Sequence, residues 1–239
     1  MDPAPTKRLL KQDMSNQVLI ILHQATSTPG RIGTLLKSRG YNLIIKRPAL
    51  GDKLPDTLEG DYAAAIMFGG PMSANDKDDF IRYEKDWIQL PLKEDIPFLG
   101  ICLGAQLLAC SIGGSIKIKD HVEIGYYPIR PTAYGEKIID WPPFVHQWHR
   151  EWMQPPDDAK ILAIGQGEEP QAFQYSKRAY GIQFHSELTL AMVNRWLVKA
   201  EHRLTLNGAQ QREKHFEGRY MHDNHVKTWL NNFFDLLLK

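Results

Sequence analysis

Short uninterrupted runs of apolar residues alternate with amphipathic segments through the first half of the chain. A run such as Val18–Leu22 is typical of a strand buried on both faces, whereas apolar residues three or four positions apart indicate a helix. The alternation predicts an α/β protein with an open, mostly parallel central sheet and helices on both faces. We expect strands at 18–22, 41–46, 62–68 and 97–101, and helices at 31–39, 78–90 and 103–112.

After Gly114 the pattern changes to short strand-like runs separated by turns, which predicts an antiparallel extension of the sheet. Pairs of prolines at 142–143 and 155–156 mark loops, and we interpret the tryptophans near them as the anchors of a loop. From Leu188 onward the apolar spacing is helical, so the last helix is expected to pack on the body of the protein. The strand-like runs lie at 116–118, 122–130, 160–164, 171–175 and 180–184.

Residues 1–16 are polar, contain two prolines and show no apolar period, so we expect a flexible leader there. A chain of 239 residues makes one large domain or two small ones. We expect residues 17–239 to form a single domain with C-terminal helices. Cys102 and Cys110 are eight positions apart in an expected helix, too far to form a disulfide, so we expect free thiols and a cytoplasmic protein.

The charge balance narrows the classes of function. Lys and Arg number 29 against 28 Asp and Glu, and the net charge is +1. Nucleic-acid binders show a clear basic excess instead. No apolar run approaches the ~18 residues of a membrane span, and the N-terminus lacks the apolar core of a secretory signal. We therefore expect no nucleic-acid partner and no membrane association.

The first candidate for chemistry is Gly100-Ile101-Cys102-Leu103-Gly104, at the junction of an expected strand and helix. This is the cysteine form of the nucleophile elbow, in which a sharp turn exposes the nucleophile and glycine alone fits at the flanking positions. The thiol would lie at a helix N-terminus, where the helix dipole and free N–H groups favour the thiolate. A buried cysteine that happens to follow a strand is the alternative.

A histidine and an acid end a later apolar strand, in the segment Gly181–Glu187. A cysteine nucleophile needs a base within hydrogen-bond reach, and the base needs a group that orients it. At the carboxyl edge of a parallel sheet His185 can face Cys102, and Glu187 can hold the imidazole in its working tautomer. Taken alone, a histidine at a strand end is more often structural.

A glycine-rich turn, Gly69-Gly70-Pro71, follows the strand expected at 62–68. Such a turn can present backbone N–H groups to a developing oxyanion, and with the N–H of Leu103 it would form an oxyanion hole. An ordinary Gly-Gly-Pro turn is the alternative when this tripeptide is considered alone.

Together, the segments GICLGAQLLA, GIQFHSE and FGGPMS resemble the class I glutamine amidotransferase domain of the Cys-His-Glu triad type, in order and in spacing. The chain looks similar to stand-alone proteins related to the glutaminase domain of GMP synthetase, a group that includes plant γ-glutamyl peptidases. The resemblance covers roughly residues 18–190. It implies a flavodoxin-like α/β fold.

The resemblance also implies a mechanism. Cys102 would attack the γ-carboxamide of glutamine and form a γ-glutamyl thioester, with His185 as the proton carrier and Glu187 as its orienting group. The N–H groups of Gly70 and Leu103 would form the oxyanion hole. No cofactor is implied, and the released ammonia would pass to an acceptor on a separate synthetase subunit.

Three positions bear on substrate recognition. Gln106 matches a glutamine of the family and is implied to bind the α-amino and α-carboxylate end of the substrate, the alternative being a solvated helix residue. Ser186 stands where the family usually has proline, which would loosen the turn between the histidine and the acid. The segment His146–Glu151 departs from a His-Trp-His-Gly-Asp pattern of relatives at Arg150, so a pocket-lining and a structural role both stay open for His149.

The sequence signals for a metal site or a phosphate-binding loop are weaker. The pairs His146/His149 and His222/His225 have no Cys or carboxylate cluster at a recognisable ligand spacing, so no metal site is predicted. The chain has no G-x-x-x-x-G-K-[ST] signature, so no phosphate-binding loop is predicted.

Three functions remain in view. The protein is expected to be a glutaminase subunit that supplies ammonia to a separate synthetase chain. Alternatively, it is a self-sufficient γ-glutamyl peptide hydrolase, or a non-catalytic binding protein on the same scaffold. The substrate in both enzymatic interpretations is glutamine or a γ-glutamyl small molecule.

Overall fold

The computed structural model of the protein describes residues 16–239. The leader expected at 1–16 falls, except for Asn16, outside the described residues. Regular structure begins with β1 (Gln17–Ile21), and Asn16 O accepts a hydrogen bond from Asn42 N at 2.7 Å. Within the described part of the chain, no helix is both long and apolar enough to cross a membrane.

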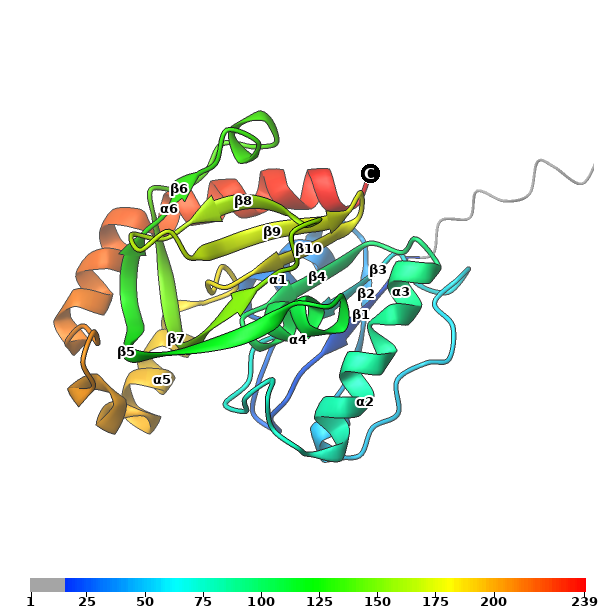
Figure 1. Cartoon of the computed structure of the whole chain (residues 1–239), viewed down its shortest axis with the longest axis horizontal. Coiled ribbons are helices and arrows are strands. Elements are labelled where there is room, and N and C mark those ends of the chain that lie inside the picture. Colours follow the sequence, from blue (N-terminus) through cyan, green and yellow to red (C-terminus); the bar gives the residue numbers. More distant parts are fainter. Residues whose placement is uncertain (1–15) are drawn as a thin grey trace, which may run out of the picture.

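An eight-stranded sheet forms the centre of the protein, in the order β2-β1-β3-β4-β10-β9-β8-β6 (Figure 1). The first five strands in this order are parallel, and the last three continue the sheet in antiparallel pairs. The mostly parallel sheet with an antiparallel extension is therefore confirmed. The bounds are β2 (Asn42–Lys46), β3 (Ala64–Met67), β4 (Phe98–Ile101), β10 (Ala179–Ile182), β9 (Pro170–Ser176), β8 (Lys160–Ile164) and β6 (Arg130–Pro131).

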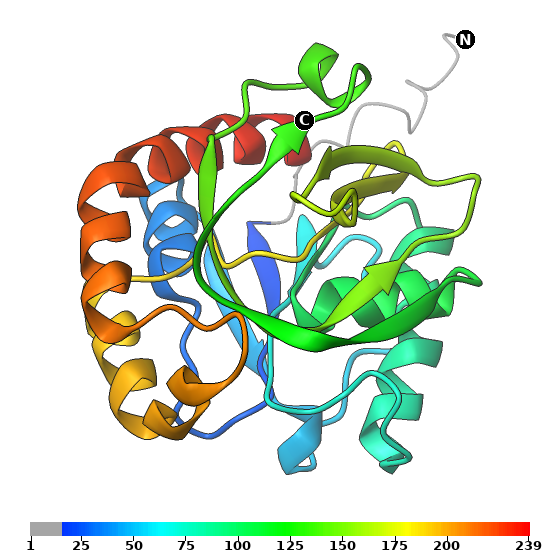
Figure 2. The same ribbon diagram turned by 60° about the vertical axis from the view of Figure 1, so that its left-hand side comes forward.

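Helices pack on both faces of this sheet (Figures 1 and 2). Alternate residues of β1 point to opposite faces: Val18 and Ile20 belong to one apolar cluster, and Leu19 and Ile21 to the other. The first cluster includes α1 (Gly30–Ser38) and α6 (Arg212–Leu237), and the second includes α2 (Asp79–Trp87) and α4 (Leu103–Ser111). The other helices are α3 (Gln89–Lys93), α5 (Leu190–Lys199) and the short 3-10 helices η1 (Pro48–Leu50), η2 (Gly135–Lys137) and η3 (Glu201–Thr205).

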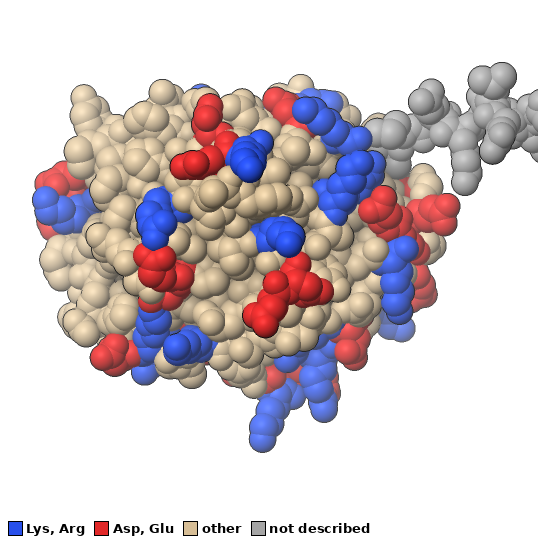
Figure 3. Space-filling view, turned by 45° about the horizontal axis from the view of Figure 1, so that its top comes forward, with Lys and Arg blue, Asp and Glu red and all other residues tan. Residues whose placement is uncertain are grey.

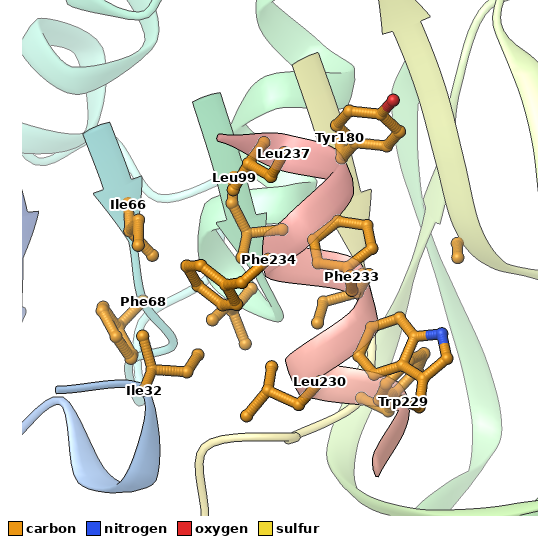
Figure 4. Close-up of a cluster of buried hydrophobic side chains, with 14 of the residues drawn as sticks. Ile32, Ile66, Phe68, Leu99, Tyr180, Trp229, Leu230, Phe233, Phe234 and Leu237 are labelled. Carbon is orange, nitrogen blue, oxygen red and sulfur yellow. The ribbon is translucent and has the colours of Figure 1, made fainter. Parts of the chain in front are cut away.

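The last helix, α6, covers the sheet with an aromatic stripe (Figure 4). Trp229, Phe233 and Phe234 are at most 2% exposed and pack with Leu230 and Leu237 in the first cluster. The rings of Trp229 and Phe233 stack at 4.9 Å. Each such side chain stabilises the fold by about 1.5–3 kcal/mol on burial. The expected packing of this helix on the body of the protein is confirmed.

The stretch between the two proline pairs is a strand, so the predicted loop is wrong. β7 (Phe144–Gln154) pairs with β5 (Ser115–Pro128) in a separate antiparallel two-stranded sheet. Buried polar residues such as Gln147 and His149 interrupt the apolar alternation that would otherwise mark a strand. The two short runs expected at 116–118 and 122–130 fall largely in the single long strand β5.

Two further elements differ from expectation. The strand expected at 180–184 is β10, which pairs in parallel with β4 and so belongs to the central sheet, not to the antiparallel extension. The helix expected at 78–90 is divided into α2 and α3. Pro91 has no N–H to donate to a carbonyl of the preceding turn, which weakens a continuous helix there.

Candidate functional site

Neighbouring parallel strands end at one edge of the sheet, and the residues that follow them line one cavity. β3 leads to Gly69 and Gly70, β4 leads to Cys102, and β10 leads to His185. Because β3 pairs with β4 and β4 pairs with β10, these carboxyl ends are adjacent. All four residues line a cavity of about 460 Å³, a size typical of small-molecule sites.

Cys102 occupies a strained turn between β4 and α4. Its backbone has a φ of 51°, a left-handed conformation that costs about 1–3 kcal/mol in a non-glycine residue. Its N–H donates to Ile182 O at 2.8 Å, which ties the turn to β10. A Cβ on Gly100 would lie 2.4 Å from Gly104 O, and one on Gly104 would lie 2.1 Å from Met67 O. The glycines of the elbow are therefore required by the close approach of strand and helix.

His185 and Glu187 form a buried pair beside Cys102. His185 Nδ1 lies 2.7 Å from Glu187 Oε1, and Ser186, which stands between them in place of the family's proline, is buried and leaves this contact intact. Burial by itself lowers the pKa of His185, but the charge of Glu187 and the charge and hydrogen bond of Cys102 outweigh it and raise that pKa to about 10. The geometry therefore favours an imidazolium at neutral pH.

The Gly69-Gly70 turn lies directly against this pair. A Cβ on Gly69 would lie 3.0 Å from His185 Cε1 and 3.3 Å from Cys102 Cβ, and one on Gly70 would lie 3.0 Å from Leu103 Cδ2. Leu103 is the first residue of α4, so its N–H has no acceptor within the helix. The structure thus brings the two residues expected to form an oxyanion hole next to each other and next to the thiol.

Two candidates from the sequence do not reach the cavity. Gln106 is 3% exposed and donates from Nε2 to Glu151 O at 2.9 Å, so it is neither a cavity-lining residue nor a solvated one. His149 is also buried outside the lining, with Nε2 3.1 Å from Glu123 Oε2. Of the segment 146–151, Trp148 lines the cavity. The placement of His149 fits the structural alternative.

The cavity carries cationic side chains that the sequence analysis did not single out. Arg195, Lys199 and Arg203 line it. The spacing of four places Arg195 and Lys199 on one side of α5, and Arg203 follows on η3. The carboxylate in the same lining is that of Glu187, which is paired with His185. Over the face shown in Figure 3, by contrast, cationic and anionic side chains are interspersed.

Arg203 is the deepest of the three cations. It is half-buried, whereas Arg195 and Lys199 are exposed. Burial lowers the pKa of the Arg203 guanidinium, a negative charge on Cys102 raises it, and Arg150 lowers it further. The guanidinium therefore lies within electrostatic reach of the thiol and faces the same cavity.

Two tryptophans form an apolar wall of the cavity. Trp148 from β7 and Trp196 from α5 both line it, with ring centroids 5.5 Å apart. The rings of Trp196 and His185 also form a T-shaped contact, with their centroids 4.9 Å apart. This wall limits the access of water to the imidazole on one side.

The two cysteines differ in their surroundings. Both are free, but Cys110 is half-buried on α4 outside the cavity lining, where burial raises the pKa of its thiol. Cys110 is therefore a suitable internal control for Cys102. Within residues 16–239, no group of three or more His, Cys, Asp or Glu is placed to hold a metal ion.

Comparison with known sequences reveals related proteins. The family model "Glutamine amidotransferase class-I" matches residues 31–201. The chain is 28% identical over 187 residues to the glutamine amidotransferase-like protein YfeJ of Salmonella typhimurium, covering 74% of this chain and 78% of that one. It is 27% identical over 157 residues to a subunit of the glutamine-hydrolyzing GMP synthase of Sulfolobus acidocaldarius, covering 64% of this chain and 80% of that one.

Solved structures agree with the fold. A glutamine amido transferase from Methylobacillus flagellatus superposes with a TM-score of 0.87 over 94% of both chains, at 24% identity. A glutamine amidotransferase from Thermotoga maritima superposes with a TM-score of 0.83, at 28% identity, over 93% of this chain and 98% of that one. Since the family model matches well over half of the chain, the protein belongs to the class I glutamine amidotransferase family.

Proposed function

We propose that the protein hydrolyses the γ-amide of glutamine, or of a γ-glutamyl compound, through a thioester on Cys102. The observation that carries this proposal is the meeting of Cys102 and the His185–Glu187 pair in one cavity. The raised pKa of His185 supports an imidazolium beside Cys102, and a thiolate–imidazolium pair is the reactive form of a cysteine nucleophile. Membership of an amidotransferase family supports the same substrate class.

In the first half-reaction the Cys102 sulfur attacks the γ-carbonyl carbon, and a C–S bond forms. The carbonyl electrons move to oxygen, where the N–H groups of Gly70 and Leu103 stabilise the charge. Loss of one such donor typically costs about 2.7–4 kcal/mol in the transition state. His185 then gives its proton to the leaving nitrogen as the C–N bond breaks, so that ammonia or an amine departs and a γ-glutamyl thioester remains.

In the second half-reaction the neutral His185 takes a proton from water while the water oxygen attacks the thioester carbon. The C–S bond breaks, the product forms as the γ-carboxylic acid of glutamate and loses its proton to solvent, and the thiolate–imidazolium pair is restored. Glu187 accepts a hydrogen bond from His185 Nδ1, which leaves Nε2 as the nitrogen that exchanges protons with the sulfur, the leaving group and water.

Recognition of the substrate carboxylate is assigned to cations of the cavity in place of Gln106. Arg203 lies within electrostatic reach of Cys102, and Lys199 and Arg195 follow toward the surface. A guanidinium binds a carboxylate through two parallel hydrogen bonds, and partial burial strengthens such a contact. This supports Arg203 as the anchor of a carboxylate whose γ-amide lies at the thiol.

The fate of the ammonia follows from the similar proteins. Several of them are named as one subunit of a glutamine-hydrolyzing GMP synthase. By this similarity we propose that the ammonia passes to an acceptor on a separate synthetase subunit. An increase in glutamine turnover when such a synthetase chain is added to the purified protein would support this arrangement.

A self-sufficient γ-glutamyl peptide hydrolase is the second candidate function. The three cations of the cavity exceed what the single α-carboxylate of glutamine requires. A γ-glutamyl amide whose amine part carries a further carboxylate would occupy them more fully. Faster hydrolysis of γ-glutamyl dipeptides than of glutamine, by the purified chain alone, would favour this candidate.

The proposal is tested by measuring glutamate and ammonia release from glutamine and from γ-glutamyl peptides. Cys102→Ala is expected to lower kcat/KM by a factor on the order of 10⁶, whereas the matched variant Cys110→Ala keeps the activity. Full activity in Cys102→Ala would contradict the mechanism. An inactive wild-type chain whose Cys102 is not labelled by a glutamine-like chloroketone would instead favour a non-catalytic binding protein.

A further inference from the structure

A second buried histidine–carboxylate pair lies against the Gly69-Gly70 turn and has no part in the mechanism above. His23 follows β1, and Glu84 belongs to α2. His23 Nε2 lies 2.9 Å from Glu84 Oε2, and His23 Nδ1 lies 3.2 Å from Gly69 O. Both side chains are fully buried. Glu84 Oε1 has no hydrogen-bond partner among the described residues, so His23 is what holds this carboxyl group.

The Gly69-Gly70 turn is in contact with both His23 and His185. A Cβ on Gly70 would lie 2.9 Å from His23 Cβ, so the imidazole of His23 packs directly against this glycine. A Cβ on Gly69 would lie 3.0 Å from His185 Cε1 and 3.3 Å from Cys102 Cβ. The turn therefore meets the reacting pair at Gly69 and the second pair at Gly70.

The contact with Gly69 O fixes the role of one ring nitrogen of His23. Gly69 O can accept a hydrogen bond but cannot donate one, so Nδ1 is the donor in this contact. The other ring nitrogen, Nε2, faces Glu84 Oε2, and this second contact holds the orientation of the imidazole.

We propose that the His23–Glu84 pair positions the Gly70 N–H for the oxyanion. The Gly69–Gly70 peptide is planar and trans, so the Gly69 carbonyl and the Gly70 N–H point in opposite directions. A hydrogen bond that holds Gly69 O on His23 directs the Gly70 N–H away from His23, and both glycines line the cavity. Without this bond a Gly-Gly peptide has wide rotational freedom, and the donor loses its direction.

This inference rests on the proposed function, and it makes His23 a positioning residue, since His23 is not among the residues that line the cavity. An oxyanion donor acts in the transition state and contributes little to the binding of the ground state. Loss of the pair is therefore expected to lower kcat and to leave KM nearly unchanged.

The main variant removes the pair as a unit, His23→Leu with Glu84→Met, because removing His23 alone leaves a buried carboxylate without its partner. We expect kcat to fall by a factor of about 10² to 10³, as for the loss of one oxyanion donor. Two conservative variants are the controls. His23→Asn with Glu84→Gln keeps an N–H donor near Gly69 O without leaving a buried carboxylate unpaired, and Glu84→Gln alone keeps a hydrogen-bond partner for Nε2, so both are expected to retain most of kcat.

Two further measurements separate positioning from a general loss of structure. An aldehyde analogue of glutamine forms a hemithioacetal with Cys102, whose oxygen occupies the oxyanion position, so its affinity should fall by the same factor as kcat. Alkylation of Cys102 by iodoacetamide needs the thiolate but no oxyanion, so its rate should stay that of the wild type.

A folded double variant with wild-type kcat and wild-type aldehyde affinity would overturn the inference, while the proposed function would stand on the activity of the wild type and its loss in Cys102→Ala. A wild type without hydrolytic activity would instead overturn the proposed function and this inference with it. If the first double variant does not fold, His23→Met with Glu84→Leu carries the same expectation. Equal losses in His23→Asn with Glu84→Gln and in an apolar double variant would also contradict a role through Gly69 O.

Discussion

Two buried histidine–carboxylate pairs in this protein show opposite shifts. His185 lies 2.7 Å from Glu187 in the cavity, and His149 lies 3.1 Å from Glu123 between β7 and β5. Burial lowers the pKa of both imidazoles. At His185 the charges of Glu187 and Cys102 prevail and raise the pKa to about 10, whereas at His149 burial prevails and the pKa is lowered. One histidine is therefore cationic at neutral pH, and the other is neutral.

The two carboxylates also differ in their other partners. Glu123 Oε2 also accepts a hydrogen bond from Gln171 Nε2 at 3.0 Å, and Lys119 acts on the same carboxylate. Glu187 Oε2 has no hydrogen-bond partner within the described residues, and Cys102 adds a second negative charge at His185. An acidic neighbour alone therefore does not make a buried histidine a proton carrier. At His185 the interaction with Cys102 adds to that with Glu187, whereas at His149 the neighbouring His185 lowers the pKa further.

Exchanging each histidine for glutamine tests this comparison most strongly. His185→Gln removes the imidazole beside Cys102, so kcat/KM is expected to fall by a factor on the order of 10⁶. His149→Gln keeps a hydrogen-bonding side chain outside the cavity and should leave turnover close to that of the wild type. Glutamate release from glutamine measures both, and equal losses in the two variants would break the comparison.

The carboxylates provide the second test, through the pH profile. The wild type should lose activity as the pH rises through about 10, because His185 then has no proton for the leaving group. Glu187→Gln removes a charge that raises this pKa, so the alkaline limb should move to lower pH. We also expect kcat to fall by about 10⁴ as the tautomer is lost. Glu123→Gln is the control, and an unshifted limb in Glu187→Gln would contradict the assignment.

The third test concerns stability, to which we expect the His149–Glu123 pair to contribute more than the His185–Glu187 pair. Burial raises the pKa of Glu123, but the hydrogen bonds from His149 and Gln171 and the charge of Lys119 prevail, and the net shift is downward. His149→Leu should therefore lower the free energy of unfolding by about 1–3 kcal/mol at pH 7. A lowered carboxyl pKa stabilises the fold above the unfolded value of about 4.3 and ceases to do so as the pH falls through the folded value. Urea unfolding should show the deficit shrinking in that range.

The smallest expected effect concerns the cation nearest to the reacting pair. Arg203→Gln removes a half-buried guanidinium from the cavity, so KM for glutamine should rise about tenfold, in line with a charged hydrogen bond. Arg150→Gln makes the same change in charge at an exposed position outside the cavity lining and should leave KM unchanged. Equal changes in KM would show that Arg203 acts through general electrostatics and not through contact with the substrate.

Much of the central sheet and its edge could be predicted because the signals are local. Each parallel strand is a short apolar run, and Gly70, Cys102 and His185 each follow such a run within a few residues. Because the carboxyl ends of adjacent parallel strands meet at one edge, residues far apart in sequence could be expected in one cavity. The strands at 144–154 and 179–182 were harder to predict, because the partner and the direction of a strand in a sheet are set by pairing between distant segments.

The side chains that line the cavity were predicted less well. Gln106 was expected at the substrate but donates to a backbone carbonyl of β7, a strand that its buried polar residues conceal in the sequence. The cations at 195, 199 and 203 are ordinary helix residues in sequence, and their meaning depends on the cavity that they face. His23 follows a buried strand and could have been noticed, but its partner Glu84 lies in another element.

The amino-acid order by itself determined the elbow around Cys102, because a side chain on Gly100 would collide with the first turn of the helix that follows within a few residues. The tertiary structure decided which of the buried histidines carries a charge. Burial is common to His185 and His149, and the balance is set by anions and donors that reach each ring from other strands and helices. Steric constraints between residues a few positions apart can be recognised from the sequence, whereas Coulomb energies depend on distances that only the folded chain establishes.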